Sequence, residues 1–199
     1  MEKIKVWKLD DSVSVAEVDR FPDDLYTKQL KQHLLADYPM LPWRENLAGD
    51  EVEKIRSLSN NIKEKYFLRL ALIKNDELIG WSVGWQDSVD DATFYMAASL
   101  VLPGFRQKGY YSELVRCVLE RTKEHGFQSL SSRHVMTNNP VLIAKMKLGF
   151  IVSGFEVTPV HGALIRLTYH HDELRKAAAR FRAGAIGETE ILRLLKQSE

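Results

Sequence analysis

A short polar loop between an apolar segment and an amphipathic one holds the residues best suited to chemistry. Residues 104–109 have the sequence GFRQKG, with Arg106 and Lys108 as two cations and Gly109 at the end. A strand that ends before this loop and a helix that begins near Tyr110 leave backbone N–H groups free, and the helix dipole adds about half a positive charge. Glycine lets a ligand approach the backbone closely. The combination favours binding of a phosphate or pyrophosphate, although a basic surface turn closed by a glycine has the same composition.

The loop and a later segment together resemble the two signatures of the GNAT acyltransferase superfamily. Residues 101–111 (VLPGFRQKGYY) match a strand ending in hydrophobic-x-Pro, then Arg/Gln-x-x-Gly-x-Gly/Ala, the acetyl-CoA signature of that family. Residues 138–150 (NNPVLIAKMKLGF) match the second signature, in which an Asn precedes a short helix and Lys-x-Gly-Phe. Tyr111 departs from the pattern, since the family prefers Gly or Ala there. Its side chain either points into the core or hinders CoA.

The resemblance implies acetyl-CoA as co-substrate and places most of its contacts on backbone groups. In the family pattern the strand before the loop pairs with the pantetheine arm, the loop cradles the pyrophosphate, and the Asn of the second signature contacts the CoA arm. A strand N–H near Leu100 would polarise the thioester carbonyl. The implied CoA-binding residues are Leu100, Val101, Leu102, Arg106, Gln107, Lys108, Gly109, Tyr110, Tyr111, Ser112 and Asn138.

The resemblance also implies positions for a general acid and a general base, and this sequence departs from the family at each. Lys145 stands where many members have a Tyr as acid, and Tyr95 where some have a Glu as base. Arg133 stands at the other position where a Glu base occurs, with His134 beside it. His134 has the best intrinsic pKa for a base, about 6.5. The catalytic candidates are therefore His134, Tyr95 and Lys145.

Each catalytic candidate has a structural alternative. Lys145 is either a proton donor, a ligand of a CoA phosphate or a plain surface lysine. His134 is either a base or a strand-end histidine bonded to backbone, and Tyr95 is either catalytic or part of the core. Members of the family also use a base that acts through water, so the missing Glu does not exclude catalysis.

The elements that must position these residues follow from hydrophobic periodicity. A strand at 3–9 and two helices at 23–37 and 50–59 precede three strands of an antiparallel meander, at 65–73, 77–86 and 93–102. A helix at 110–125, a strand at 127–135, a helix at 140–148 capped by Asn139, and strands at 150–158 and 163–170 complete the pattern. We expect an α+β fold, which under the resemblance is the GNAT fold: a central mixed sheet of about seven strands flanked by helices.

The end of the chain lies outside the resemblance. Residues 172–182 and 188–196 have the periodicity of two helices, joined by a Gly-containing link. We expect a GNAT domain over 1–171 and a C-terminal helical hairpin extension over 172–199, which packs either on its own chain or on a partner.

Composition narrows the class of protein. The chain has 199 residues, of which 45% are hydrophobic and 28% are charged, with a net charge of +1. This balance gives no general attraction to nucleic acid or anionic membranes. Cys117 is the one cysteine, so an intrachain disulfide and a Cys-rich zinc site are excluded, and its place in the helix indicates packing. We expect a cytoplasmic protein with no metal, no nucleic-acid partner and no membrane association.

Two functions of different class are compatible with these features, and a third is weaker. The first is an acetyl-CoA-dependent N-acetyltransferase that acts on a primary amine of a small molecule or a protein by direct attack in a ternary complex. The second is an acyl-CoA-binding sensor or scaffold on a GNAT fold that has lost turnover, which the residues at 111, 133 and 145 favour. The third is an interaction protein whose helical tail assembles a homodimer.

Overall fold

A single mixed sheet carries both signature segments in the computed structural model, which describes residues 1–34, 65–90, 92–159 and 161–196. Its eight strands lie in the order β1-β2-β3-β4-β5-β6-β8-β7. All neighbours are antiparallel except β5 and β6, which are parallel. The strands are β1 (Lys3–Lys8), β2 (Val13–Val18), β3 (Phe67–Lys74), β4 (Glu77–Gln86), β5 (Thr93–Val101), β6 (Ser129–Val135), β7 (Ile151–Thr158) and β8 (Gly162–His170).

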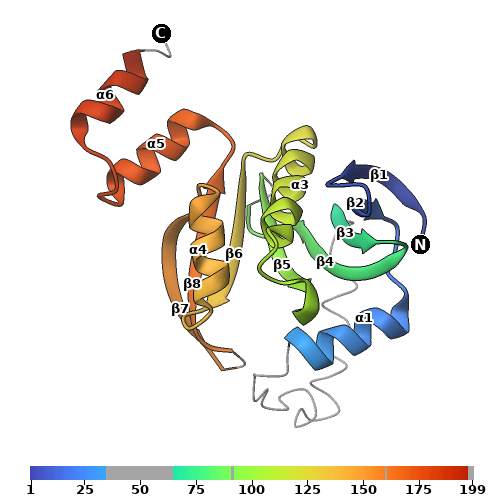
Figure 1. Ribbon diagram of the computed structural model, residues 1–199. Helices are drawn as coiled ribbons and strands as arrows, with labels where there is room; N and C mark the ends of the chain where they lie inside the picture. The colour runs from blue at the N-terminus through green and yellow to red at the C-terminus, as the bar shows by residue number, and fades with distance from the viewer. Residues whose placement is uncertain (35–64, 91, 160, 197–199) are drawn as a thin grey trace.

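Helices cover both faces of the sheet. Helices α3 (Tyr110–Glu124) and α4 (Asn139–Lys147) lie over one face, which we call the α3–α4 face (Figure 1). Helix α1 (Asp23–Gln29) and the π-helical turn η1 (Leu30–Leu34) pack on the other, the α1 face. The meander of β3, β4 and β5, the helix after the loop, and the two final strands confirm the α+β fold expected from the sequence.

Three details differ from the sequence expectations. The first strand is followed at once by β2, so that residues 3–18 form a hairpin and the sheet has eight strands rather than about seven. The regular part of the helix expected over 23–37 ends at Gln29. Helix α4 is capped by Asn138 and begins at Asn139, one residue earlier than expected. The helix expected over 50–59 lies outside the described residues.

Alternation along each strand builds a core on both faces. In β3, Leu68, Leu70 and Leu72 point to the α3–α4 face, where they pack among residues of α3 such as Leu114. The intervening Ala71 and Ile73 join Trp81 and Leu100 under α1. Because both faces are covered, the central strands β3, β4 and β5 are mostly apolar on both sides rather than strictly alternating with polar residues.

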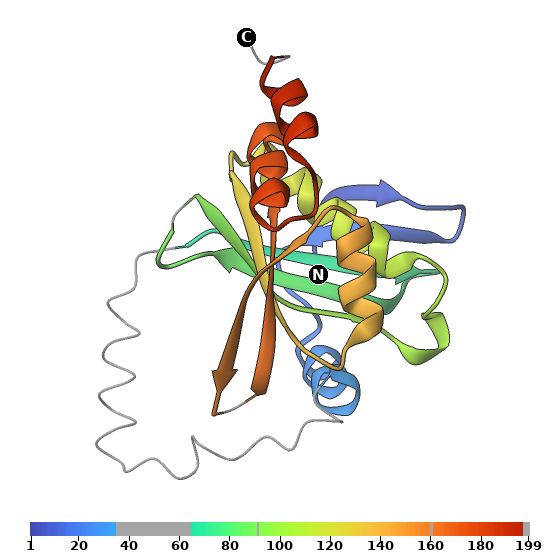
Figure 2. The same cartoon turned by 90° about the vertical axis from the view of Figure 1, so that its left-hand side faces the viewer.

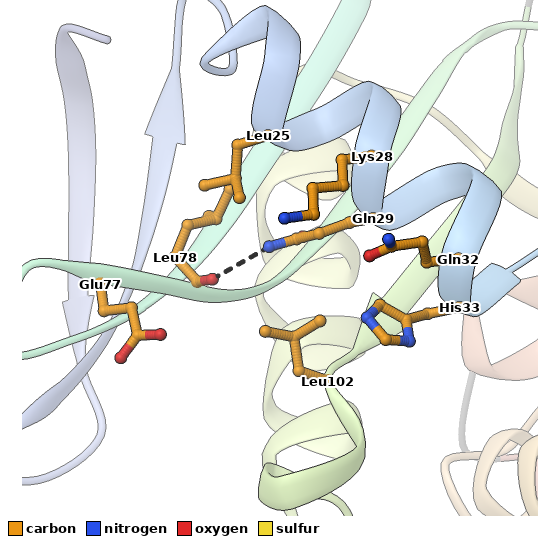
Figure 3. Close-up of a pocket in the computed structure, with 8 residues that line it drawn as sticks. All are labelled: Leu25, Lys28, Gln29, Gln32, His33, Glu77, Leu78 and Leu102. Carbon is orange, nitrogen blue, oxygen red and sulfur yellow. Dashed lines mark hydrogen bonds between the residues drawn. The ribbon is translucent and has the colours of Figure 1, made fainter.

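A buried polar pair fastens α1 to the sheet. Gln29 and Trp81 are 4% and 0% exposed. The indole N–H of Trp81 donates to Gln29 Oε1 at 3.0 Å. Gln29 Nε2 donates to the carbonyl of Leu78 at 3.3 Å (Figure 3). Gln29 therefore satisfies two buried groups of β4 at once, which fixes the position of α1.

Replacement of Gln29 by Leu is expected to destabilise the fold. The buried indole N–H of Trp81 would lose its acceptor and the Leu78 carbonyl would lose one donor, and a buried group left unsatisfied costs about 1–3 kcal/mol. Urea unfolding of Gln29→Leu should show this loss in the free energy of unfolding, whereas Lys28→Leu, one residue earlier, should change it by less than about 0.5 kcal/mol. Equal stability of Gln29→Leu and wild type would contradict the assigned contact.

The C-terminal segment forms two helices, α5 (Glu173–Arg182) and α6 (Glu188–Lys196), that extend from the end of β8 (Figures 1 and 2). The carboxylate of Asp172 accepts from the backbone N–H of Arg175 at 2.7 Å and caps α5. Ala177, Ile186 and Ile191 form a small core between the two helices. Both helices lie where the sequence periodicity places them.

Candidate functional site

The sheet forks between β5 and β6. The two strands pair from Thr93↔Ser129 to Met96↔Ser132, and their pairing ends there. Strand β5 nevertheless continues to pair with β4 as far as Val101. Over the same stretch β6 stays paired with β8 as far as Val135. Figure 2 shows β7 and β8 running steeply across the direction of β4 and β5. The far half of β5 therefore presents one backbone edge to the space between the diverging strands.

A bulge and the strand register decide which backbone groups face that fork. The partners of Val83 and Gly84 in β4 are Ala98 and Met96, so Ala97 is an extra residue in β5. Beyond the bulge, the N–H of Leu102 donates to the carbonyl of Ile79 at 2.9 Å. In an antiparallel pair the residues bonded across the ladder alternate. Leu100 and Leu102 therefore direct their backbone N–H and C=O groups toward β4.

Ser99 and Val101 are the residues whose backbone groups face the fork. The side chain of Arg106 identifies this edge, since its Nε donates to the carbonyl of Val101 at 3.0 Å. Of the three strand residues expected to hold the pantetheine arm, the register thus favours Val101. It adds Ser99, which sequence reasoning missed. The only sequence signal for Ser99 is alternation from Val101, and the bulge makes that alternation hard to read.

The loop after β5 presents a row of backbone N–H groups. Within the described part of the chain, no acceptor is recorded for the N–H groups of residues 107–111. Gln107 and Gly109 have positive φ angles of 62° and 82°, which turn the chain sharply before α3. A Cβ built on Gly109 would meet nothing within 4 Å. The N-terminus of α3 therefore opens onto free space, as a phosphate cradle requires.

The remaining loop residues divide into those that face this space and those that do not. Ser112 uses its N–H for the helix, donating to the Gly109 carbonyl at 2.9 Å, so it does not extend the row. Tyr111 packs against the core of the α3–α4 face, and burial raises the pKa of its phenol. Its side chain thus points away from the cradle, which resolves the alternative left open by the sequence. Tyr110 also packs on that core, and Lys108 lies over the Phe105 ring at 5.8 Å.

Lys145 lies at the apex of the fork, on the α3–α4 face. Its Nζ donates to Ser132 Oγ at 2.8 Å and lies 3.5 Å from Met96 Sδ. Met96 and Ser132 are the last pair of β5 and β6 before the strands part. The residue is only 1% exposed, and the Phe150 ring centroid is 4.8 Å from Nζ. Lys145 is therefore a buried amine, not a surface lysine.

Burial lowers the pKa of Lys145 to about 7. Desolvation disfavours the ammonium form, and the recorded partners of Nζ are a hydroxyl, a thioether and an aromatic ring. Near neutral pH the amine can therefore exchange a proton, which an ordinary lysine with a pKa of about 10.4 does not.

His134 joins Lys145 through the same serine. The Nε2 atom of His134 lies 3.0 Å from Ser132 Oγ, so the hydroxyl connects the ring to the amine. Burial, with a smaller contribution from Lys145, lowers the pKa of His134 to about 3. At neutral pH the ring is thus neutral and a weak base. The ordinary pKa on which the sequence argument relied does not hold here.

Tyr95 and Arg133 lie on the α1 face of the fork, one residue from Met96 and Ser132. The Nε of Arg133 donates to Tyr95 Oη at 3.0 Å, and its guanidinium lies 4.8 Å from the ring centroid. Neighbouring residues in a strand point to opposite faces. The three catalytic candidates therefore all lie near the fork, but on opposite faces of the sheet. Tyr95 lies on the α1 face, whereas Lys145 and His134, which are joined through Ser132, lie on the α3–α4 face.

Asn138 lies in the link between β6 and α4, where it caps the helix without a side-chain hydrogen bond. Within the described residues its side chain has no recorded partner and is half-buried. It is thus available to a ligand in the open end of the fork.

Sequence reasoning missed Ser132, Glu156 and Arg166. Ser132 has one weak signal, a polar residue at the inward position that follows Leu130 in the strand alternation. Glu156 bridges Arg133 and Arg166 at 3.1 and 3.3 Å. Glu156 and Arg166 belong to β7 and β8. Nothing in the sequence around either residue indicates that it lies near the fork.

A separate pocket lies between α1, η1 and the start of β4 (Figure 3). Eight residues line it, and of the CoA-binding residues expected from the sequence only Leu102 is among them. Its polar groups are mixed, with Lys28, His33 and Glu77 around the rim. The side chain of Gln29 is already hydrogen-bonded to Trp81 and Leu78.

Two further features concern chemistry outside the fork. Cys117 is buried and burial raises the pKa of its thiol to about 12, which makes it unreactive at neutral pH. No helix in the described ranges is both long enough and apolar enough to span a bilayer.

Comparisons with known proteins agree on one family. The model of the acetyltransferase (GNAT) family matches residues 27–150. Among solved structures, yncA from Salmonella typhimurium, with its cofactor acetyl-CoA, is 14% identical with a TM-score of 0.60, covering 82% of this chain and 96% of its own. An acetyltransferase from Bacillus subtilis in complex with CoA is 16% identical with a TM-score of 0.55, covering 78% and 97%.

A third structure is the ribosomal-protein-S18-alanine N-acetyltransferase from Escherichia coli. It is 14% identical with a TM-score of 0.54, covering 79% of this chain and 93% of its own. A search of curated proteins gave no match. At these identities the solved structures establish a shared fold.

Proposed function

Because the chain belongs to the acetyltransferase (GNAT) family, we propose that it transfers the acetyl group of acetyl-CoA to a primary amine of a small molecule or a protein. The acceptor attacks the thioester directly, in a ternary complex with both substrates bound. The observation that carries this proposal is the row of free N–H groups at residues 107–111, next to a fork lined by the free backbone edge of β5.

The loop and the fork supply the two contacts that acetyl-CoA needs. The pyrophosphate binds the N–H row at the N-terminus of α3, where the helix dipole favours negative charge. The pantetheine arm then lies along β5 and pairs with the groups of Val101, and Asn138 contacts the arm from the opposite side. The N–H of Ser99 polarises the thioester carbonyl and stabilises the oxyanion that forms on attack.

Lys145 is proposed as the proton donor. As the acceptor nitrogen bonds to the carbonyl carbon, the C–S bond breaks and its electron pair passes to the sulfur of CoA. A thiol has an ordinary pKa near 8.5, so an ammonium with a pKa of about 7 gives its proton to the thiolate favourably. The proton that the acceptor nitrogen loses then restores the ammonium by way of solvent. Ser132 and His134 position the amine.

The base is proposed to be solvent rather than a side chain. His134 is a weak base because of burial, and Tyr95 accepts a hydrogen bond from a guanidinium. An acceptor amine that arrives neutral needs no side-chain base, and a family member without a Glu at these positions can work through water.

The acetyltransferase domain is proposed to comprise residues 1–171, and residues 172–199 are proposed to form a helical extension. The whole chain is proposed to act in the cytoplasm. The separate small core of α5 and α6 supports this division. Contacts of α5 with the sheet domain include a bond of Arg175 Nη1 to Gln128 Oε1 at 3.1 Å.

Calorimetric titration with acetyl-CoA tests the proposal. We expect one site, and at about 100 times Kd the ligand should stabilise the fold by about 2.7 kcal/mol. For a domain of this size that raises the melting temperature by roughly 5–10 °C. Release of CoA thiol with a panel of amines then tests turnover. Tight binding without turnover on any amine would favour the acyl-CoA sensor, and absence of binding at millimolar acetyl-CoA would overturn both functions.

A further inference from the structure

The two faces of the fork differ in access. On the α3–α4 face, Lys145 of α4 is 1% exposed and Ser132 of β6, to which it bonds, is 0% exposed. On the α1 face, the side chain of Arg133 is 40% exposed. An acceptor that reaches the thioester must therefore enter past Tyr95 and Arg133, because the opposite face is closed by packed side chains.

The open face carries two arginines side by side. Arg133 of β6 and Arg166 of β8 are register partners, so their side chains leave the sheet together. Glu156 of β7 bonds to Arg133 Nη1 at 3.1 Å and to Arg166 Nη2 at 3.3 Å. One carboxylate thus faces two guanidinium groups, which leaves one positive charge uncompensated. Each guanidinium carries five N–H donors, and the recorded bonds use only some of them.

A row of aromatic rings leads to this arginine pair. Phe67, Trp85 and Tyr95 lie on the neighbouring strands β3, β4 and β5, with ring centroids 5.7 and 5.5 Å apart. Phe67 is 50% exposed. The row ends where the Arg133 guanidinium lies over the Tyr95 ring. Successive rings are tilted by 45° and 62°, and at the far end the Arg69 guanidinium lies 5.5 Å from the Phe67 ring centroid. An aromatic surface is thus joined to the cationic Arg133 next to the fork.

We infer that the acceptor amine carries a carboxylate of its own and an apolar body. The inference rests on the proposed acetyl transfer, since it names the substrate class of that site. The carboxylate pairs with free N–H groups of Arg133 and Arg166, in the forked geometry that guanidinium offers. The apolar body lies on the aromatic row, and the amine points into the fork.

The charge of the arginine pair also discriminates between acceptors. The carboxylate of an acid acceptor compensates the positive charge that Glu156 leaves on Arg133 and Arg166. The same charge repels acceptors with several ammonium groups and no acid, so polyamines are poor substrates.

Matched ligands that differ only in the acid group test this inference without requiring turnover. N-acetyl-phenylalanine, N-acetyl-leucine and N-acetyl-tyrosine represent products, and their amides lack the charge. Each is titrated by calorimetry into the full-length protein, with and without saturating CoA. We expect at least one acid to bind about tenfold more tightly than its amide. Arg166→Gln should remove that preference and leave amide binding unchanged.

Arg116→Gln is the matched control, since Arg116 is an exposed arginine of α3 whose side chain is 55% exposed. It should keep the preference for the acid. The same lack of preference in all three pairs, or a preference that survives Arg166→Gln, would overturn the inference. Failure of the proposed function has a different signature, because the protein would then either not bind CoA or bind it and release no CoA thiol with any amine.

Discussion

Gly109→Glu is expected to abolish acetyl-CoA binding while the protein stays folded. Gly109 lies in the middle of the N–H row, with a φ of 82° and open space around the position of a Cβ. A glutamate there places a side chain and a negative charge where the pyrophosphate would lie. Strain from the positive φ costs about 1–2 kcal/mol, which a domain with a core on both faces of its sheet tolerates. Calorimetry should show Kd for acetyl-CoA raised by more than 100-fold.

Gly126→Glu supplies a control with the same backbone strain at the other end of the helix. Gly126 follows the C-terminus of α3, has a φ of 87°, and likewise has nothing within 4 Å of a built Cβ. A carboxylate is unfavourable at this end of the helix dipole and favourable at the other. Gly126→Glu should therefore be no more stable than Gly109→Glu and still bind acetyl-CoA. Binding by Gly109→Glu within about threefold of wild type would remove the loop as the phosphate site.

Lys145→Met is expected to lower kcat by about 100-fold or more, which is the usual contribution of a positioned acid. Methionine has a similar length and fits the apolar surroundings of Met96 and Phe150, so the fold and KM for acetyl-CoA should change little. The measurement is the release of CoA thiol at saturating acetyl-CoA, with the acceptor that turns over fastest. Lys147→Met, an exposed lysine on the same helix, should retain wild-type kcat. Unchanged turnover in Lys145→Met would show that the thiolate leaves without this proton.

The pH dependence of turnover gives the same variant a second signature. A donor with a pKa of about 7 is protonated below that pH, so its contribution falls as pH rises through 7. The neutral fraction of the acceptor amine rises over the same range. The two opposing effects together predict a bell-shaped dependence of turnover on pH. His134 is the titratable group that faces Lys145, and its low pKa keeps it neutral throughout. Lys145→Met should lose the descending limb and keep the ascending one.

Stability should respond to pH through the same group. The pKa of Lys145 is lowered from 10.5 in the unfolded chain to about 7 in the folded protein. Between these values the unfolded chain binds a proton that the folded chain lacks, so the free energy of unfolding rises with pH. Below about pH 7 both states are protonated and the contribution is constant. Urea unfolding of Lys145→Met should show a smaller slope than wild type between pH 7 and 10.

The hairpin at the N-terminus shows where periodicity alone was insufficient. Residues 13–18 (VSVAEV) are buried along almost their whole length, including Glu17 at 6% exposure. Glu17 reaches Arg121 of α3 at 2.6 Å, which pairs its charge. A charged residue in a buried strand weakens the alternation that would identify it. The ion pair that makes its burial tolerable joins residues over 100 positions apart.

The sequence by itself determined the loop over residues 104–109 for which phosphate binding is proposed, the order of the described elements after residue 65, and the family. These features are local: a glycine at a helix start, a turn of two cations, and apolar periods of strand and helix. The second signature likewise identified α4 and the position of Lys145 on it. Each of these signals occupies about a dozen neighbouring residues, which is why the chain alone carries it.

Only the tertiary structure decided which groups face the fork between β5 and β6. The bulge at Ala97 and the ladder with β4 turn Ser99 and Val101 toward the fork, and register is a property of paired strands. The packing of α4 on the sheet buries Lys145 and lowers its pKa, whereas the sequence left it as acid, phosphate ligand or surface residue. The arginine pair exists because β6 and β8 are neighbours in the sheet. Protonation state and charge complementarity depend on burial and proximity, and these arise only once the chain has folded.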